Sequence, residues 1–145
     1  MLIGCASGRV PVSRFVGTWR LVRALERQPD GRQAPFADVG VLMYDSGGRM
    51  AGQLMRRDRP AFSAGDPKRG TAQEMRAAFD GYDAYFGRYR VDTVTHVVTH
   101  QVEGGLFANE VDTTYRRRYR FAGDSLLLTP FDTNEHWSAV FVREQ

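Results

Sequence analysis

The stretch that decides the fold is Arg14-Phe15-Val16-Gly17-Thr18-Trp19-Arg20-Leu21-Val22, which opens the first clear strand with a glycine followed by a tryptophan. Gly17 has no side chain, so the backbone can pass close to whatever covers this end of a sheet. Trp19 is the bulkiest side chain available to fill that end. We therefore expect Gly17 and Trp19 to be structural residues at one end of a β-rich domain. An ordinary core tryptophan is the alternative.

Short strands separated by turns make up most of the remaining chain. Residues 28–31 (Gln-Pro-Asp-Gly) and 45–48 (Asp-Ser-Gly-Gly) have turn composition, because proline fixes φ and glycine accepts a positive φ. Residues 32–38 are expected to form a loop. The expected strands cover residues 20–27, 39–44, 49–57, 88–92, 94–102, 111–121, 125–129 and 136–143. About eight strands with short reversals predict a mainly β, antiparallel up-and-down barrel, since closure leaves no open edge.

Alternation of side chains assigns a face to each residue of a strand. In the first strand, Trp19, Leu21, Arg23 and Leu25 share one face. In the strand over 94–102, one face carries His96, Val98, His100 and Val102.

One segment follows helical spacing instead. Thr71 and Glu74 form the pattern of a capping box, and the apolar residues that follow recur every three or four positions. These residues are Met75, Ala78, Phe79, Tyr82 and Phe86. The pattern predicts one helix over about residues 72–85, ended by Gly87, which we place as a lid across an open end of the barrel.

Length and composition indicate one domain. The chain has 145 residues, of which 42% are hydrophobic, which suffices for a single core. We expect a flexible N-terminal segment over 1–12 and a barrel domain over 13–145. Cys5 is the only cysteine, so no internal disulfide can form. No run approaches the roughly 20 apolar residues of a membrane helix, and we expect a cytoplasmic protein with no membrane partner.

Arginines account for the net charge of +3. In the strand over 111–121, Arg116, Arg118 and Arg120 fall on one face, whereas Tyr115, Arg117 and Tyr119 fall on the other. A nucleic-acid surface needs aromatic and basic side chains together on one accessible face. The segregation favours a solvated barrel exterior and no nucleic-acid partner.

Several motifs in order resemble the bacterial and fungal lipocalin-like domain family. They are Phe15–Leu21, Val41–Asp45 with Gly48–Met50, Met55–Pro60, Phe79–Gly87, Thr99–Glu103, and Arg117–Tyr119 followed by Gly123–Leu126. The resemblance implies a calycin barrel with an inserted helix and a small-molecule cavity, and an Arg143 side chain packed on the ring of Trp19. Some barrels of this general kind act as cyclases, isomerases or dehydratases on polyketide-like substrates.

The sequence contains no glycine-rich phosphate loop, no nucleophilic serine elbow and no closely spaced His/Cys set, so we expect no cofactor and no metal. His96 and His100 lie roughly 13 Å apart by strand rise, too far to share one ion. If His100 points inward, it enters an apolar lumen beside Tyr115 and Arg117. An imidazole near neutral pH can exchange protons, and a tyrosine and an arginine can stabilise a developing oxyanion.

The candidate catalytic residues are therefore His100 as acid or base with Arg117 and Tyr115 as electrostatic partners. The candidate ligand-binding residues are Tyr119, Val98, Met43, Tyr82 and Phe86. In the structural alternative, a neighbouring tyrosine or a backbone carbonyl satisfies His100, and a carboxylate such as Glu103, Glu110 or Asp112 pairs with Arg117.

Three classes of function remain open from the sequence. The first is a cofactor-independent cyclase, isomerase or dehydratase of secondary metabolism, acting on an apolar or polyketide-like molecule. The second is a non-catalytic binding or carrier protein for such a ligand, and the third is an interaction module with a filled barrel. Formation of a homodimer is left open. The competing architecture is the cone-shaped barrel of the ketosteroid-isomerase type, although that fold begins with helices.

Overall fold

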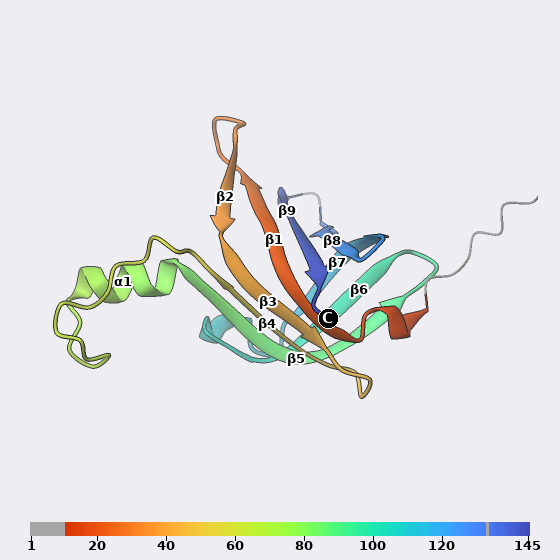
Figure 1. Cartoon of the computed structure of the whole chain (residues 1–145), viewed down its shortest axis with the longest axis horizontal. Coiled ribbons are helices and arrows are strands. Elements are labelled where there is room, and N and C mark those ends of the chain that lie inside the picture. Colours follow the sequence, from red (N-terminus) through yellow and green to blue (C-terminus); the bar gives the residue numbers. More distant parts are fainter. Residues whose placement is uncertain (1–10, 133) are drawn as a thin grey trace, which may run out of the picture.

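Nine antiparallel strands form one continuous sheet in the computed structural model, which describes residues 11–132 and 134–145 (Figure 1). The strands are β1 Gly17–Arg27, β2 Gln33–Ala37, β3 Val39–Tyr44, β4 Arg49–Met55, β5 Tyr82–Asp92, β6 Val97–Gly105, β7 Thr114–Ala122, β8 Ser125–Pro130 and β9 Trp137–Arg143. The helices are the short 3₁₀ turns η1 Val12–Arg14 and η2 Ala108–Glu110 and the α-helix α1 Ala72–Asp80. Nearly all of the proposed flexible segment 1–12 lies outside the described residues.

The sheet closes because β1 pairs with both β3 and β9. Eight strands form this closed barrel, and every pairing in it is antiparallel. The predicted antiparallel barrel is therefore confirmed. The remaining strand, β2, is not part of the closed barrel. It pairs only with residues 24–27 of β1, whereas β3 pairs with residues 17–20 of the same strand. The predicted hairpin turn at 45–48 is also confirmed, with Gly48 at a φ of 84°.

Aromatic side chains close one end of the barrel. Trp19 is 1% exposed and donates its ring N–H to the carbonyl oxygen of Phe15 over 2.8 Å. Phe15 itself is fully buried, with its ring centre 4.8 Å from that of Tyr119 and 5.4 Å from that of Tyr44. Edge-to-face rings pack densely, and none of these four aromatic residues lines the cavity of the barrel.

A β-bulge shifts the faces of β1, and the predicted face of this strand is wrong beyond Leu21. The register with β9 passes from Leu21 opposite Phe141 to Arg23 opposite Val140. One extra residue in a strand reverses the facing of all that follow. Arg23 is consequently exposed and Ala24 is buried.

The segment 32–38, expected as a loop, instead contains β2 despite Pro35. Proline is tolerated there because β2 is an edge strand with one partner. A second register shift, between Ala24 opposite Ala37 and Leu25 opposite Pro35, makes Phe36 the extra residue on this strand.

The helix ends earlier than predicted, at Asp80 rather than near residue 85. The capping box of Thr71 and Glu74 is present, but Gly81 caps the carboxyl end, and the chain from Tyr82 onward is β5. None of the residues of α1 is buried, and Figure 1 shows the helix set to one side of the barrel near the start of β5. The predicted lid is therefore wrong. Among residues 11–132 and 134–145, no helix has the length and apolar character needed to cross a lipid bilayer.

His96 lies in a turn and not in a strand. Its backbone has a φ of 56°, and β6 begins one residue later at Val97. Val98, His100 and Val102 keep their predicted common face, and all three are buried.

Candidate functional site

The barrel encloses a cavity of about 190 Å³ between the aromatic end and the β1–β2 hairpin. Most of its wall is apolar. The apolar lining comprises Phe36, Val41, Leu42, Gly52, Leu54, Leu128, Trp137, Ala139 and Phe141. Drug-sized ligands occupy pockets of roughly 300–1,000 Å³. The smaller volume suits a molecule of about one ring with short substituents.

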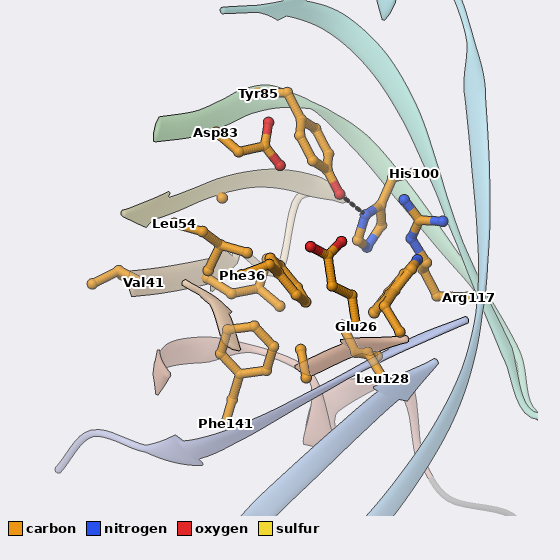
Figure 2. Close-up of a pocket in the computed structure, with 14 residues that line it drawn as sticks. Glu26, Phe36, Val41, Leu54, Asp83, Tyr85, His100, Arg117, Leu128 and Phe141 are labelled. Atoms are coloured by element: carbon orange, nitrogen blue, oxygen red, sulfur yellow. Dashed lines mark hydrogen bonds between the residues drawn. The ribbon is translucent and has the colours of Figure 1, made fainter. Parts of the chain in front are cut away.

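Five polar side chains complete the wall, and Figure 2 shows them pointing into the same space. They are Glu26 of β1, Asp83 and Tyr85 of β5, His100 of β6 and Arg117 of β7. Adjacent strands bring the last four together, since β5 pairs with β6 and β6 pairs with β7. Glu26 reaches the lumen because the bulge in β1 turns it to the same face as Ala24.

His100 lies at the inner side of this polar group and is only 1% exposed. Its Nε2 is 2.8 Å from the hydroxyl of Tyr44, and its Nδ1 is 2.8 Å from the hydroxyl of Tyr85. Burial, with a smaller contribution from the Arg117 charge, lowers the pKa of His100 to about 3. The imidazole is therefore neutral at physiological pH and engaged through both nitrogens.

Arg117 stacks between two aromatic rings, with its guanidinium carbon 4.6 Å from the ring centre of Tyr115 and 4.7 Å from that of Trp137. Its side chain is 13% exposed and lies 3.5 Å from a carboxylate oxygen of Glu135. Tyr115 pairs with His100 across β6 and β7, but its hydroxyl donates to Glu110 over 3.1 Å, outside the cavity wall. The structure thus brings His100 and Arg117 to the cavity and places Tyr115 behind them.

The two carboxylates of the cavity lie where it meets solvent, since Glu26 and Asp83 both remain exposed. Desolvation by the surrounding protein atoms nevertheless raises the pKa of Asp83, while the Arg117 charge acts in the opposite direction. Glu110 is buried below Gly105, and desolvation raises its pKa as well.

The residues proposed for ligand contact from sequence occupy several different positions. Val98 and Tyr119 are buried in the barrel interior, where Tyr119 packs on Phe15, and neither borders the cavity. Met43 and Phe86 face outward and are 49% and 50% exposed, because each is adjacent in its strand to a residue that faces inward, Leu42 and Tyr85 respectively. Tyr82 lies on the outer surface, where its hydroxyl donates to Gln53 over 2.6 Å.

Sequence reasoning missed Tyr44, Tyr85, Asp83, Glu26 and Phe36. The two tyrosines and Asp83 could have been found from alternation, because each lies on the inward face of its strand. No local signal marks Glu26 or Phe36, whose orientation depends on bulges.

Within the described part of the chain, no three His, Cys, Asp or Glu side chains are grouped closely enough to hold an ion.

Comparisons with known proteins agree with the barrel. The sequence profile described as "Lipocalin-like domain" matches residues 16–140. A 4'-hydroxy-3'-methoxypropiophenone carrier protein, ppsC of Aspergillus oryzae, is 33% identical over 86 residues, covering 55% of this chain and 78% of the relative.

Two solved structures share the fold at low sequence identity. A lipocalin-like protein from Bacteroides uniformis and an uncharacterized protein from Bacteroides eggerthii each superpose with a TM-score of 0.50 at 12% identity. Each superposition covers 90% of this chain and 99% of the other.

Proposed function

The chain belongs to the lipocalin-like domain family, and we propose that it binds a small aromatic or polyketide-like molecule in the barrel cavity. The observation that carries this proposal is the cavity of about 190 Å³, whose walls are mostly apolar and whose polar groups converge on one side. Apolar walls supply the free energy of binding, and a few placed polar groups fix the orientation of the ligand.

The relative from Aspergillus oryzae supports a ligand of this size. Its name describes a carrier of 4'-hydroxy-3'-methoxypropiophenone, a ketone on a single benzene ring. A molecule of that class has one flat apolar body for the aromatic wall and oxygen atoms for the polar side. We use it as a probe for this chain.

The state of His100 favours binding over proton transfer by this residue. An effective acid or base at neutral pH needs a pKa near the working pH. Burial lowers the pKa of His100 to about 3, and tyrosine hydroxyls lie at both of its nitrogens. We therefore assign His100 to positioning, and Arg117 to the electrostatics of the cavity wall.

Calorimetric titration with 4'-hydroxy-3'-methoxypropiophenone tests the proposal. We expect one molecule bound per chain, confirmed by native mass spectrometry. Ala139 is buried and lines the cavity, so Ala139→Leu fills part of it and should weaken binding at least about tenfold. Ala51→Leu, outside the cavity lining, is the matched control. Failure of the unmodified protein to bind, or equal binding by both variants, contradicts the proposal.

One observation favours a second candidate, cofactor-independent isomerisation or cyclisation. Asp83 borders the cavity with a pKa raised by desolvation, which makes its carboxylate a better proton acceptor. Arg117 would then stabilise the enolate that forms. Proton NMR in D₂O separates the candidates: binding alone leaves the protons next to the probe's carbonyl unexchanged, whereas an enzyme exchanges them and loses this activity in Asp83→Asn.

A further inference from the structure

We infer that the cavity recognises an uncharged carbonyl group through the hydroxyl of Tyr85, which a hydrogen-bonded chain from Tyr44 through His100 orients as a donor. This inference rests on the proposed binding function and names the chemical group that the ligand presents to the inner polar side.

The argument begins with the ring of His100. A neutral imidazole carries one N–H donor and one acceptor nitrogen. Tyrosine hydroxyls lie 2.8 Å from each nitrogen, so one tyrosine donates to the ring and the other accepts from it. The direction of the chain therefore depends on which tyrosine needs the acceptor nitrogen.

Tyr44 needs it. This side chain is buried among the rings of Phe15 and Tyr89, whose centres lie 5.4 Å and 4.7 Å from its own. Among residues 11–132 and 134–145, the Tyr44 hydroxyl has a single hydrogen-bond partner, Nε2 of His100. A buried hydroxyl that cannot donate is costly, so Tyr44 donates to Nε2.

The N–H of His100 then lies on Nδ1 and donates to the oxygen of Tyr85. Unlike Tyr44, Tyr85 lines the cavity, and Figure 2 shows its hydroxyl at the cavity face beside His100. With its oxygen already accepting from Nδ1, the hydroxyl proton of Tyr85 is available to an acceptor inside the cavity. The chain of three groups thus presents one oriented O–H donor to a ligand.

The charges around the cavity indicate that this acceptor is neutral. Glu26 and Asp83 both line the cavity, and Arg117, the cation that lines it, already lies 3.5 Å from Glu135. An anionic ligand would meet two carboxylates, and the one lining cation is already shared with Glu135, so the charges of the wall disfavour an anion. A ketone carbonyl accepts a hydrogen bond without bringing a charge, and flanking aromatic carbon fits the apolar wall.

A matched pair of ligands tests this inference. The first is 4'-hydroxy-3'-methoxypropiophenone, and the second is 2-methoxy-4-propylphenol, in which a methylene replaces the carbonyl. Titrations at pH 6 keep both phenols neutral. We expect the unmodified protein to prefer the ketone by about two- to tenfold, the worth of one net hydrogen bond. Tyr85→Phe should abolish this preference, while Tyr82→Phe, whose hydroxyl bonds Gln53 on the outer surface, should retain it.

The outcomes separate the two proposals. Equal affinity of the unmodified protein for both ligands, still weakened by Ala139→Leu, overturns the carbonyl inference and leaves the binding function standing. Binding of neither ligand overturns both. Two measurements on the unmodified protein remain decisive if Tyr85→Phe does not fold: ¹⁵N shifts of His100 should show the proton on Nδ1, and the infrared carbonyl band of bound ketone should shift to lower frequency. A proton on Nε2, or an unshifted band, overturns the inference.

Discussion

The guanidinium of Arg143 in the last strand lies 4.3 Å from the ring centre of Trp19 in the first strand, and the two residues are opposite each other in the pairing of β1 with β9. Arg143 also donates one hydrogen bond of 2.6 Å to the carbonyl oxygen of Val16 and another to that of Arg14. Arg143 therefore hydrogen-bonds two backbone carbonyl groups just before β1 and stacks on the indole ring of Trp19 at the same time. The contact expected from the family resemblance is present, and it fixes the closed end of the barrel.

Trp19→Ala should destabilise the protein by about 3–5 kcal/mol, because a fully buried indole is removed and the closed end cannot collapse around the gap. Trp137→Ala should cost less, since Trp137 is only partly buried at the wall of the cavity. Urea unfolding of both variants measures the difference. Equal, small losses would show that the aromatic end does not depend on Trp19.

Gly17→Ala should also destabilise the protein, by roughly 1–3 kcal/mol. Gly17 has a φ of 137°, and a Cβ atom there would lie 2.5 Å from Nη1 of Arg143. The backbone strain and the displaced guanidinium act together. Gly31→Ala is a suitable control, because Gly31 also has a positive φ but nothing lies within 4 Å of an added Cβ. Equal losses in the two variants would mean that the contact with Arg143 contributes nothing.

The barrel and its closed end follow from local sequence, but the cavity follows only in part. Turn residues, strand alternation and the Gly17–Trp19 pair are local, so they predict the strands and the inward position of His100. The sequence predicts a helix that runs on into β5, because Phe79, Tyr82 and Phe86 fit one face of a helix, although only Phe79 lies in α1. Gly81, which ends the helix, carried the competing signal.

The mouth of the cavity could not be predicted, because bulges determine it. Bulges arise from register between strands that are far apart in sequence, such as β1 and β9, and no local pattern reports that register. Glu26 and Phe36 both line the cavity. Simple alternation from Trp19 puts Glu26 on the outer face of its strand, and the sequence predicts a loop around Phe36.

Acid should weaken the fold through His100. Its pKa is lowered from 6.5 to about 3 on folding, so between these values the unfolded chain binds a proton that the folded protein does not. The free energy of unfolding should therefore fall as the pH drops below about 6.5, by up to about 1.4 kcal/mol per pH unit. Protonation of Asp83 and Glu110, whose pKa values are raised, opposes this trend.

The contribution of His100 is isolated by comparison with His100→Gln, which keeps a donor and an acceptor but does not titrate. Urea unfolding at pH 5, 6, 7 and 8 should show a steeper loss on acidification for the unmodified protein. Parallel curves would show that His100 does not titrate differently in the two states.

The helix α1 should be dispensable for ligand binding. None of its residues is buried, and the cavity lining contains none of them. The backbone bond from Arg56 N–H to the Gly81 carbonyl already joins the ends of the insertion, so a short turn can replace residues 58–80. Ligand affinity should stay within about twofold, as for other changes remote from a site. A tenfold loss in calorimetric titration would restore the role of a lid to this segment.

Phe36 should be the aromatic side chain of β2 on which affinity depends. It lines the cavity, and its ring packs edge-to-face on Trp137 at 6.4 Å between centres, so a bound ring completes an aromatic cluster at the mouth. Phe36→Ala should weaken binding of 4'-hydroxy-3'-methoxypropiophenone by about tenfold, since it removes apolar contact and one aromatic pair. Phe86→Ala is the matched control, because that ring is half exposed on the outer face of β5. If calorimetry shows that Phe86→Ala weakens binding as much as Phe36→Ala, the ligand does not lie in this cavity.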